Sequence, residues 1–134
     1  MPDGSAVSKK TKAGPISADR LKSFVERIEK LSEERKAIGD DILFAVDANC
    51  AYDRGSAIAI GQKIADNDLM WFEEPIPPDA PEEMAKVAAH TSIPIATGER
   101  LTSKYEFAHL LRVGGASILQ MATGRCGGLL EGKK

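Results

Sequence analysis

Three acidic residues, Asp47, Glu73 and Glu99, recur along the chain at an equal spacing of 26 residues. Each lies at the end of an apolar run. Carboxylates gathered at one place repel one another, and a divalent cation removes that penalty. Oxygen donors without Cys or His favour Mg²⁺, or a similar ion such as Mn²⁺. The alternative is that each acid caps a helix or faces water, but caps need no such regularity. The spacing therefore predicts a divalent-metal site.

The elements that must position these acids alternate along the chain. A helical pattern begins at Ser17 and is expected to end near Gly39. Further helical patterns cover about residues 54–66, 84–88 and 107–111, and a last one begins near residue 129. Apolar runs of strand length cover residues 42–47, 69–74, 93–99 and 117–121. The sequence therefore predicts strands that alternate with helices.

The predicted strands are continuously apolar, which is typical of a parallel sheet covered by helices and so of an α/β protein. Two architectures fit this pattern. One is an open, doubly wound sheet, and the other is about half of an eight-stranded (β/α)₈ barrel. In both, chemistry takes place at the carboxyl ends of the strands, which is where the three acids are expected to lie.

Composition and charge exclude some classes of partner for the chain. A formal net charge of −2 leaves no basic field for nucleic acid. No apolar stretch approaches the roughly 18 residues of a membrane span. The N-terminus lacks the apolar region of a secretory signal, and two cysteines make no disulfide scaffold, so a cytoplasmic protein is expected.

Residues 1–16 are rich in Gly, Ser, Pro and Lys and are expected to be poorly ordered, which leaves residues 17–134 as the domain.

The motifs VDAN at residues 46–49, WFEEP at 71–75 and TGER at 97–100, in this order and spacing, resemble the barrel domain of the enolase superfamily. The similarity covers about residues 17–134 and is greatest to the mandelate racemase and muconate-lactonizing branch. Within that branch, WFEEPIPPD and an earlier AGP are most similar to acid-sugar dehydratases such as galactonate dehydratase. The resemblance implies a partial (β/α)₈ barrel, with about half of the barrel in this chain.

The resemblance implies that Asp47, Glu73 and Glu99 bind Mg²⁺. Glu74 points the opposite way on its strand and is expected to support the site from behind. The implied reaction is abstraction of a proton alpha to a carboxylate, because a cation stabilises the negative charge that develops. Loss of the beta hydroxyl then converts a sugar acid to a 2-keto-3-deoxy acid. The family implies a lyase or a racemase/isomerase, and full-length relatives are expected to be homo-oligomers.

Further site residues are suggested by the family pattern. Lys10 and Lys12, separated by one Thr, match the Lys-x-Lys of lysine-type members and are the candidate general bases. An alternative alignment uses Lys9, and a solvated basic cluster explains these residues equally well. Asn49 is a candidate substrate contact from its place two residues after the first acid. Arg125 is a candidate anion contact, since arginine stays protonated and cannot readily serve as a base.

The sequence also departs from the family pattern. Ala122 stands where members often have an Asp that pairs with a His on the next strand. His90 and His109 are expected to lie outside the site. The capping domain and the last two barrel strands have no counterpart here, so we expect a dehydratase as the full-length relative and little turnover by these 134 residues alone.

Two functions other than catalysis also fit parts of the sequence. The first is a non-catalytic fragment that keeps a weak divalent-metal site. The second is a phosphoacceptor module in which Asp47 takes the phosphate. That module needs an acidic pair at the end of its first strand and a Lys on a late strand, and neither is found, so it ranks last.

Overall fold

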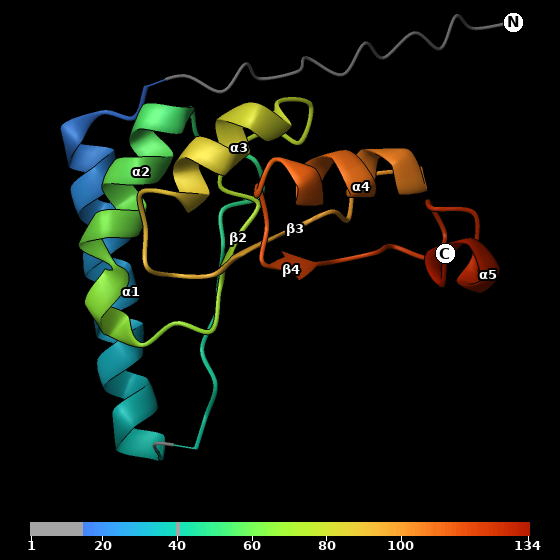
Figure 1. Cartoon of the computed structure of the whole chain (residues 1–134). Helices are drawn as coiled ribbons and strands as arrows, with labels where there is room; N and C mark the ends of the chain where they lie inside the picture. The colour runs from blue at the N-terminus through green and yellow to red at the C-terminus, as the bar shows by residue number, and fades with distance from the viewer. Residues whose placement is uncertain (1–14, 40) are drawn as a thin grey trace, which may run out of the picture.

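The computed structural model describes residues 15–39 and 41–134. Four parallel strands form one sheet in the order β1-β2-β3-β4. The strands are β1 (Val46–Asp47), β2 (Phe72–Glu73), β3 (Ile95–Thr97) and β4 (Ile118–Leu119). The order follows the chain, so each connection leads to the neighbouring strand (Figure 1). The predicted α/β alternation with parallel strands is confirmed.

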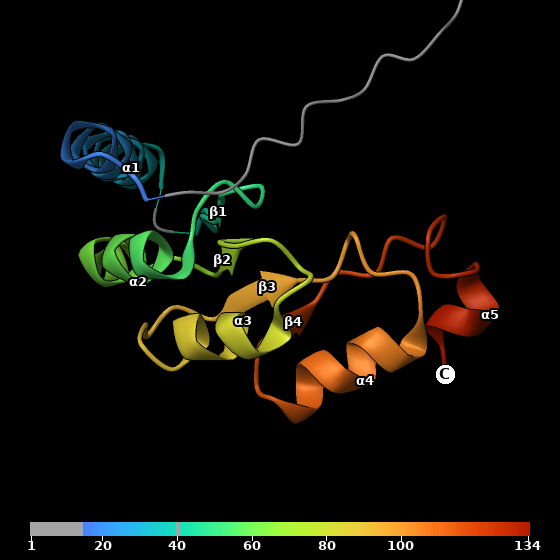
Figure 2. The same cartoon turned by 90° about the horizontal axis from the view of Figure 1, so that it is seen from above.

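Helices separate and flank the strands. They are α1 (Ala18–Ile38), α2 (Arg54–Lys63), the 3₁₀ helix η1 (Ala65–Asn67), α3 (Pro81–Ala88), α4 (Lys104–Arg112) and α5 (Leu129–Gly132). Figure 2 shows α2, α3 and α4 along one face of the sheet. Among the described residues no helix covers the opposite face of the sheet (Figure 2). The fold therefore has a helix-covered face and an open one.

The strands are shorter than the apolar runs that predict them, but their pairing continues past the assigned ends. Before the β1–β2 ladder, the Met70 amide donates to the Phe44 carbonyl at 2.8 Å, and after it the Cys50 amide donates to the Glu74 carbonyl at 2.7 Å. Regular strand geometry is lost beyond Asp47 because the backbone of the next residues bends into turns. The predicted runs thus mark paired backbone rather than ideal strand.

Side-chain caps define where the helices begin. The Ser17 side chain accepts a hydrogen bond from the Arg20 amide at the start of α1. The Asp53 carboxylate accepts from the Ser56 amide at 2.8 Å and caps α2. At α4, Ser103 and Glu106 form a capping box, in which each side chain bonds the other residue's backbone N–H. These caps satisfy amides that the first helical turn leaves free.

The hydrophobic core lies between the sheet and the helices that cover it. Phe72 on β2, Ile60 on α2 and Val87 on α3 have no exposed surface. Val46 and Ile95 are also buried, and they pair in register with Phe72 from either side. Because side chains alternate along a strand, Asp47 and Glu73 point to the open face of the sheet. The core packing therefore decides which face the acids take.

Contacts outside the sheet fix α1. The Phe24 ring on α1 meets the Tyr52 ring edge to face, with centroids 5.7 Å apart. The buried Arg35 guanidinium lies 3.3 Å from the Asp68 carboxylate, just before β2. The Ile16 amide donates to the Ser56 hydroxyl at 2.9 Å. These contacts join α1 to the β1–α2 and α2–β2 connections, and the residue before its cap to α2.

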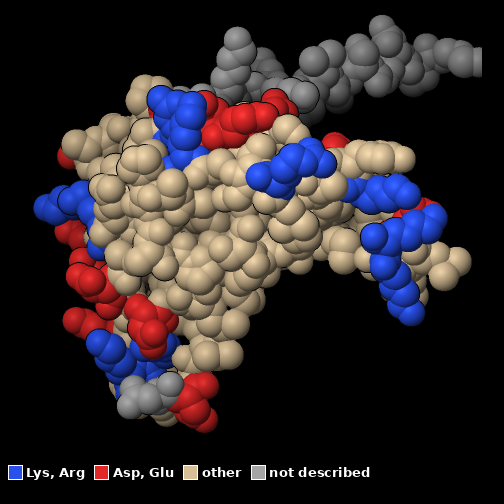
Figure 3. All heavy atoms as spheres, viewed as in Figure 1, with Lys and Arg blue, Asp and Glu red and all other residues tan. Residues whose placement is uncertain are grey.

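The surface has charged and apolar regions. In the view of Figure 3, charged side chains lie mainly toward the periphery, and the middle of the face is formed by other residues. Large apolar side chains are exposed at Leu43, Leu129 and Leu130. Over the part of the chain that the structure describes, no helix combines the length and apolarity needed to cross a membrane.

We expect Phe72→Ala to lower the free energy of unfolding by about 3–5 kcal/mol, because it leaves a cavity under β2 that neighbouring side chains fill only in part. Urea unfolding followed by circular dichroism measures this loss. Leu111→Ala on the outer side of α4 is the matched control, since Leu111 is 53% exposed. Equal losses in the two variants would contradict the assignment of Phe72 to the core.

Candidate metal centre

Asp47 and Glu73 lie side by side at the carboxyl edge of the sheet. They are the last residues of β1 and β2, and their Cα atoms are partners across the ladder. Neighbouring strands are about 4.8 Å apart, so both side chains leave the same face of the sheet within reach of one cation. Glu99 lies two residues beyond the end of β3, at the same edge. The three predicted acids therefore come from three adjacent strands.

Gly98 allows the chain to turn toward Glu99 at the end of β3. Its φ is +129°, which side-chain-bearing residues rarely adopt. A Cβ atom at this position would lie 2.7 Å from the Phe107 ring and 3.2 Å from the Gln120 carbonyl oxygen. The Gly98 backbone lies so close to Phe107 on α4 and to Gln120 after β4 that only glycine fits immediately before Glu99.

Each of the three carboxylates is engaged with a neighbour of its own. Asp47 Oδ1 accepts from the Asn49 amide at 2.7 Å, and Glu73 Oε2 accepts from the Trp71 indole at 3.0 Å. Glu99 Oε1 lies 3.7 Å from Arg100 Nη2. In these conformations, residues 15–39 and 41–134 contain no group of three or more His, Cys, Asp or Glu side chains arranged to hold a metal ion.

The donor set nevertheless has the chemistry of a magnesium or manganese site. Asp47 and Glu99 are exposed and Glu73 is half-buried, so all three are open to an arriving ion. Carboxylate oxygens are the ligands that such hard cations prefer. Rotation of Glu73 away from Trp71 requires only side-chain movement, because the backbone already places it opposite Asp47. The residues present therefore fit a divalent cation.

Glu74 is turned away from this edge into the protein. It is only 1% exposed. Its Oε2 accepts from Arg100 Nε at 2.8 Å and from Cys50 Sγ at 2.9 Å. Burial, followed by the Glu74 carboxylate, raises the pKa of the Cys50 thiol to about 12, so this thiol stays protonated and donates. The buried carboxylate is thereby held by one cation and one neutral donor.

Arg100 extends this contact to the first loop. Its Nη2 donates to Asn49 Oδ1 at 2.7 Å while its Nε donates to Glu74. The hydrogen bond to Glu74 raises the pKa of Arg100, so the guanidinium is charged at any physiological pH. We call Asn49, Cys50, Glu74 and Arg100 the arginine bridge. It links the residues that follow β1, β2 and β3.

The arginine bridge contains unusual backbone. Asn49, Cys50 and Glu74 have φ angles of 47°, 58° and 38°, in the left-handed region. For residues other than glycine this conformation costs of the order of 1–3 kcal/mol each, and it persists where surrounding contacts determine it. The side-chain hydrogen bonds of the bridge and the bond from the Cys50 amide to the Glu74 carbonyl provide such contacts.

The other predicted site residues have different positions. Asn49 lies at the carboxyl edge with the three acids. Arg125 is exposed in the turn between β4 and α5, where its amide donates to the Ala122 carbonyl at 2.8 Å. Lys10 and Lys12 lie outside the described residues.

The two histidines bond to groups of the helical layer. His90 Nδ1 lies 2.7 Å from the Lys86 carbonyl oxygen just beyond α3. His109 on α4 lies 2.8 Å from the Glu82 carboxylate on α3. Both histidines therefore lie on the helix-covered side, away from the three acids, in agreement with the expectation from the sequence.

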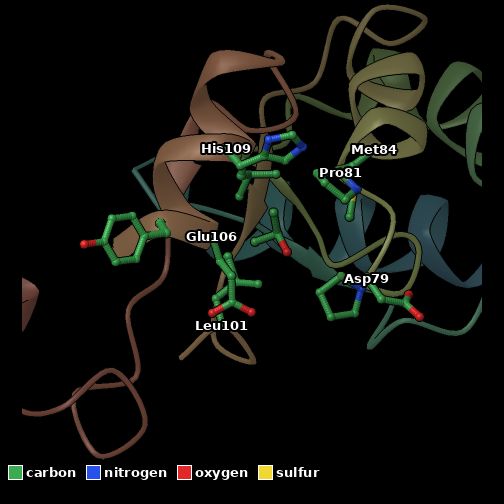
Figure 4. A pocket seen from close by; sticks show the side chains of 10 residues that line it. Asp79, Pro81, Met84, Leu101, Glu106 and His109 are labelled. Carbon is green, nitrogen blue, oxygen red and sulfur yellow. The ribbon is translucent and has the colours of Figure 1, made fainter. Parts of the chain in front are cut away.

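A cavity of about 350 Å³ lies between α3 and α4 (Figure 4). Its walls are largely apolar, with Pro81, Met84, Leu101 and Leu110 among the lining residues. None of Asp47, Glu73 and Glu99 lines it. This cavity belongs to the helical layer and is separate from the candidate metal centre.

Three residues at the edge have roles that the sequence did not predict: Trp71, Cys50 and Arg100. Trp71 bonds the carboxylate of a predicted ligand, and the other two hold Glu74. One signal was available for Arg100, which is the only cation in the motif segments VDAN, WFEEP and TGER. A single cation among four carboxylates is expected to pair with at least one of them.

The family model described as Enolase C-terminal domain-like matches residues 7–134. The chain therefore belongs to the enolase superfamily, in its mandelate racemase and muconate-lactonizing branch. It is 39% identical to L-talarate/galactarate dehydratase of Salmonella typhimurium over 104 residues, which are 78% of this chain and 26% of that protein. It is 33% identical to D-galactonate dehydratase of Ralstonia pickettii over 113 residues, 84% and 30% of the two chains.

Solved structures share the fold. A mandelate racemase/muconate lactonizing enzyme from Sulfitobacter sp. matches with a TM-score of 0.83 and 42% identity, over 90% of this chain and 30% of the other. An L-talarate/galactarate dehydratase variant liganded with Mg and L-glucarate matches with a TM-score of 0.76 and 35% identity, over 84% and 28%. The predicted family and partial barrel are confirmed, and the chain spans about 30% of the length of these relatives.

We expect Gly98→Ala to destabilise the protein more than Gly114→Ala. Both glycines have positive φ, so each alanine variant carries a backbone cost of the order of 1–3 kcal/mol. A Cβ at Gly114 meets nothing within 4 Å, whereas a Cβ at Gly98 collides with Phe107. Thermal unfolding of the two variants compares them directly. An equal loss would show that the contact with Phe107 does not constrain the turn before Glu99.

Proposed function

We propose that this chain provides the magnesium centre of an enzyme that removes the proton alpha to the carboxylate of a sugar acid. In the proposed reaction, loss of the beta hydroxyl follows, so that a sugar acid becomes a 2-keto-3-deoxy acid and water. The observation that carries the proposal is the placement of Asp47, Glu73 and Glu99 at the ends of three adjacent parallel strands. The activity is proposed for the whole protein, since this chain spans about 30% of its relatives.

Asp47, Glu73 and Glu99 would hold the cation, with Mn²⁺ as an alternative to Mg²⁺. When bound, a divalent cation binds the substrate carboxylate and stabilises the negative charge that develops as the alpha proton leaves. Glu73 would exchange its bond to the Trp71 indole for the ion, whereas Asp47 could offer Oδ2 while Oδ1 keeps its bond to the Asn49 amide.

Asn49 is suited to a substrate contact. Its Oδ1 accepts from Arg100, which fixes the amide orientation and leaves the Asn49 NH₂ group as a donor. Such a donor fits a hydroxyl or carboxylate oxygen of a sugar acid. Arg125 is proposed as a further anion contact, and Lys10 and Lys12 as the general bases that take the alpha proton.

The names of the relatives support the substrate class. Galactarate, talarate and galactonate are all sugar acids, and the related dehydratase structure holds L-glucarate together with Mg. A racemase or isomerase of the same branch begins with the same proton abstraction and remains the second candidate. The structure from Streptomyces coelicolor that is described as a racemase with bound magnesium, 29% identical, supports this alternative.

We expect the purified chain to bind Mg²⁺, and Glu99→Gln to weaken the binding by more than about tenfold, because it removes a charged ligand. Isothermal titration calorimetry measures both affinities. His109→Ala is the control, since His109 bonds Glu82 on the opposite side of the sheet. The same affinity in Glu99→Gln and the parent would exclude Glu99 from the site.

To test the reaction, the protein is incubated with Mg²⁺ and a panel of aldonic and aldaric acids, and the products are identified. A 2-keto acid identifies a dehydratase, and an epimer without loss of water identifies a racemase. Either activity should disappear in Glu73→Gln. Mg²⁺ binding without turnover in the 134-residue chain would favour the non-catalytic alternative for this chain.

A further inference from the structure

We propose that Arg100 is a positioning residue that holds the three loops of the metal centre in one geometry. The proposal rests on the proposed function, because the acids it positions are the proposed ligands. No contact of Arg100 with substrate is required. Its effect passes through Asn49 and Glu74, which neighbour the ligands in the chain.

The contacts of Arg100 reach each of the three loops. Nε donates to Glu74 after β2, and Nη2 donates to Asn49 after β1. Arg100 itself follows β3, and Nη2 lies 3.7 Å from Glu99. A guanidinium is planar and rigid, so when it donates from two sides it fixes the position of one acceptor relative to the other. One side chain thereby sets the relative positions of all three loops.

The burial of Glu74 makes this contact obligatory. A buried carboxylate is destabilising unless a cation and hydrogen bonds compensate its charge. Arg100 is the cation that bonds it, and Glu74 Oε1 has no hydrogen-bond partner among the described residues. Because Glu73 and Glu74 are consecutive, movement of Glu74 would also move the ligand beside it. Loss of Arg100 should therefore be felt at Glu73.

Asn49 carries the effect to Asp47. The Asn49 amide donates to Asp47 Oδ1, and the Asn49 side chain accepts from Arg100. Asn49 has left-handed backbone, so its conformation depends on such contacts. Without Arg100, the turn that carries Asn49 loses its long-range anchor, and Asp47 loses a fixed partner.

The experiment compares Arg100→Gln and Arg100→Lys with the parent chain, and uses Arg112→Gln as the matched control. Arg112 is an exposed arginine in the last turn of α4, at the opposite end of the helix from Ser103. Hydrogen exchange is measured by mass spectrometry without metal, at the Cys50 amide and the segments around Asn49 and Glu74. Mg²⁺ affinity is measured separately by calorimetry.

In Arg100→Gln we expect exchange in these segments to rise by about tenfold or more, as the loss of a charge-assisted hydrogen bond implies. Exchange in α1 and α3 should be unchanged. Mg²⁺ affinity should fall by about 10- to 100-fold, the usual effect of removing a group that supports ligands. Arg100→Lys keeps the positive charge but not the planar guanidinium with donors on two sides. It should therefore retain part of the exchange protection and part of the Mg²⁺ affinity. Arg112→Gln should match the parent.

Unchanged exchange around Asn49 and Glu74 in Arg100→Gln would overturn the proposal. A uniform rise in exchange across all helices would also overturn it, because that result means that Arg100 stabilises the whole fold rather than positioning the three loops. If Arg100→Gln does not fold, Arg100→Lys provides the test. Exchange and Mg²⁺ affinity equal to those of the parent in Arg100→Lys would overturn the proposal, because a lysine lacks the two-sided donors of the guanidinium. Failure of the parent to bind Mg²⁺ counts against the proposed function, while the exchange data still test whether Arg100 holds the loops.

Discussion

Electrostatic repulsion among four carboxylates at one edge of the sheet is the constraint on which the centre depends. Asp47, Glu73, Glu74 and Glu99 come from three adjacent strand ends. Negative charges gathered at one edge favour the binding of opposite charge there. Arg100 supplies one positive charge to Glu74. The remaining three acids carry negative charge that a divalent cation could offset in large part.

The fold separates this charged edge from the apolar layer by strand alternation. Val46, Phe72 and Ile95 face the helices, and the next residue on β1 and on β2 is an acid that faces the other way. A shift of one residue in the register would bury the acids and expose the core residues. The burial of Phe72 and the position of Glu73 are thus consequences of one packing arrangement.

Local patterns in the sequence predicted the order of helices and strands and the common edge of the acids, because periodicity and equal spacing are local or repeating features. The apolar runs at residues 42–47 and 69–74 were longer than the assigned strands, since hydrophobicity does not report where the backbone turns. The arginine bridge could not be predicted in the same way. Arg100 and Asn49 are 51 residues apart, and their contact exists only once three strands have paired. The left-handed backbone of Cys50 and Glu74 depends on the same long-range contacts.

The adjacent acids Glu73 and Glu74 show how one motif serves two electrostatic purposes. Glu74 is buried, so its charge must be compensated permanently within the protein, and Arg100 does so. Glu73 is half-buried and Asp47 and Glu99 are exposed, so water stabilises these charges and the proposed cation could reach them. A protein cation bonded to Glu73 would occupy the position of the proposed metal, whereas Arg100 bonded to Glu74 leaves that position open. Glu73 is the last residue of β2 and Glu74 has left-handed backbone directly after it, so the end of the strand places two neighbouring glutamates in different electrostatic surroundings.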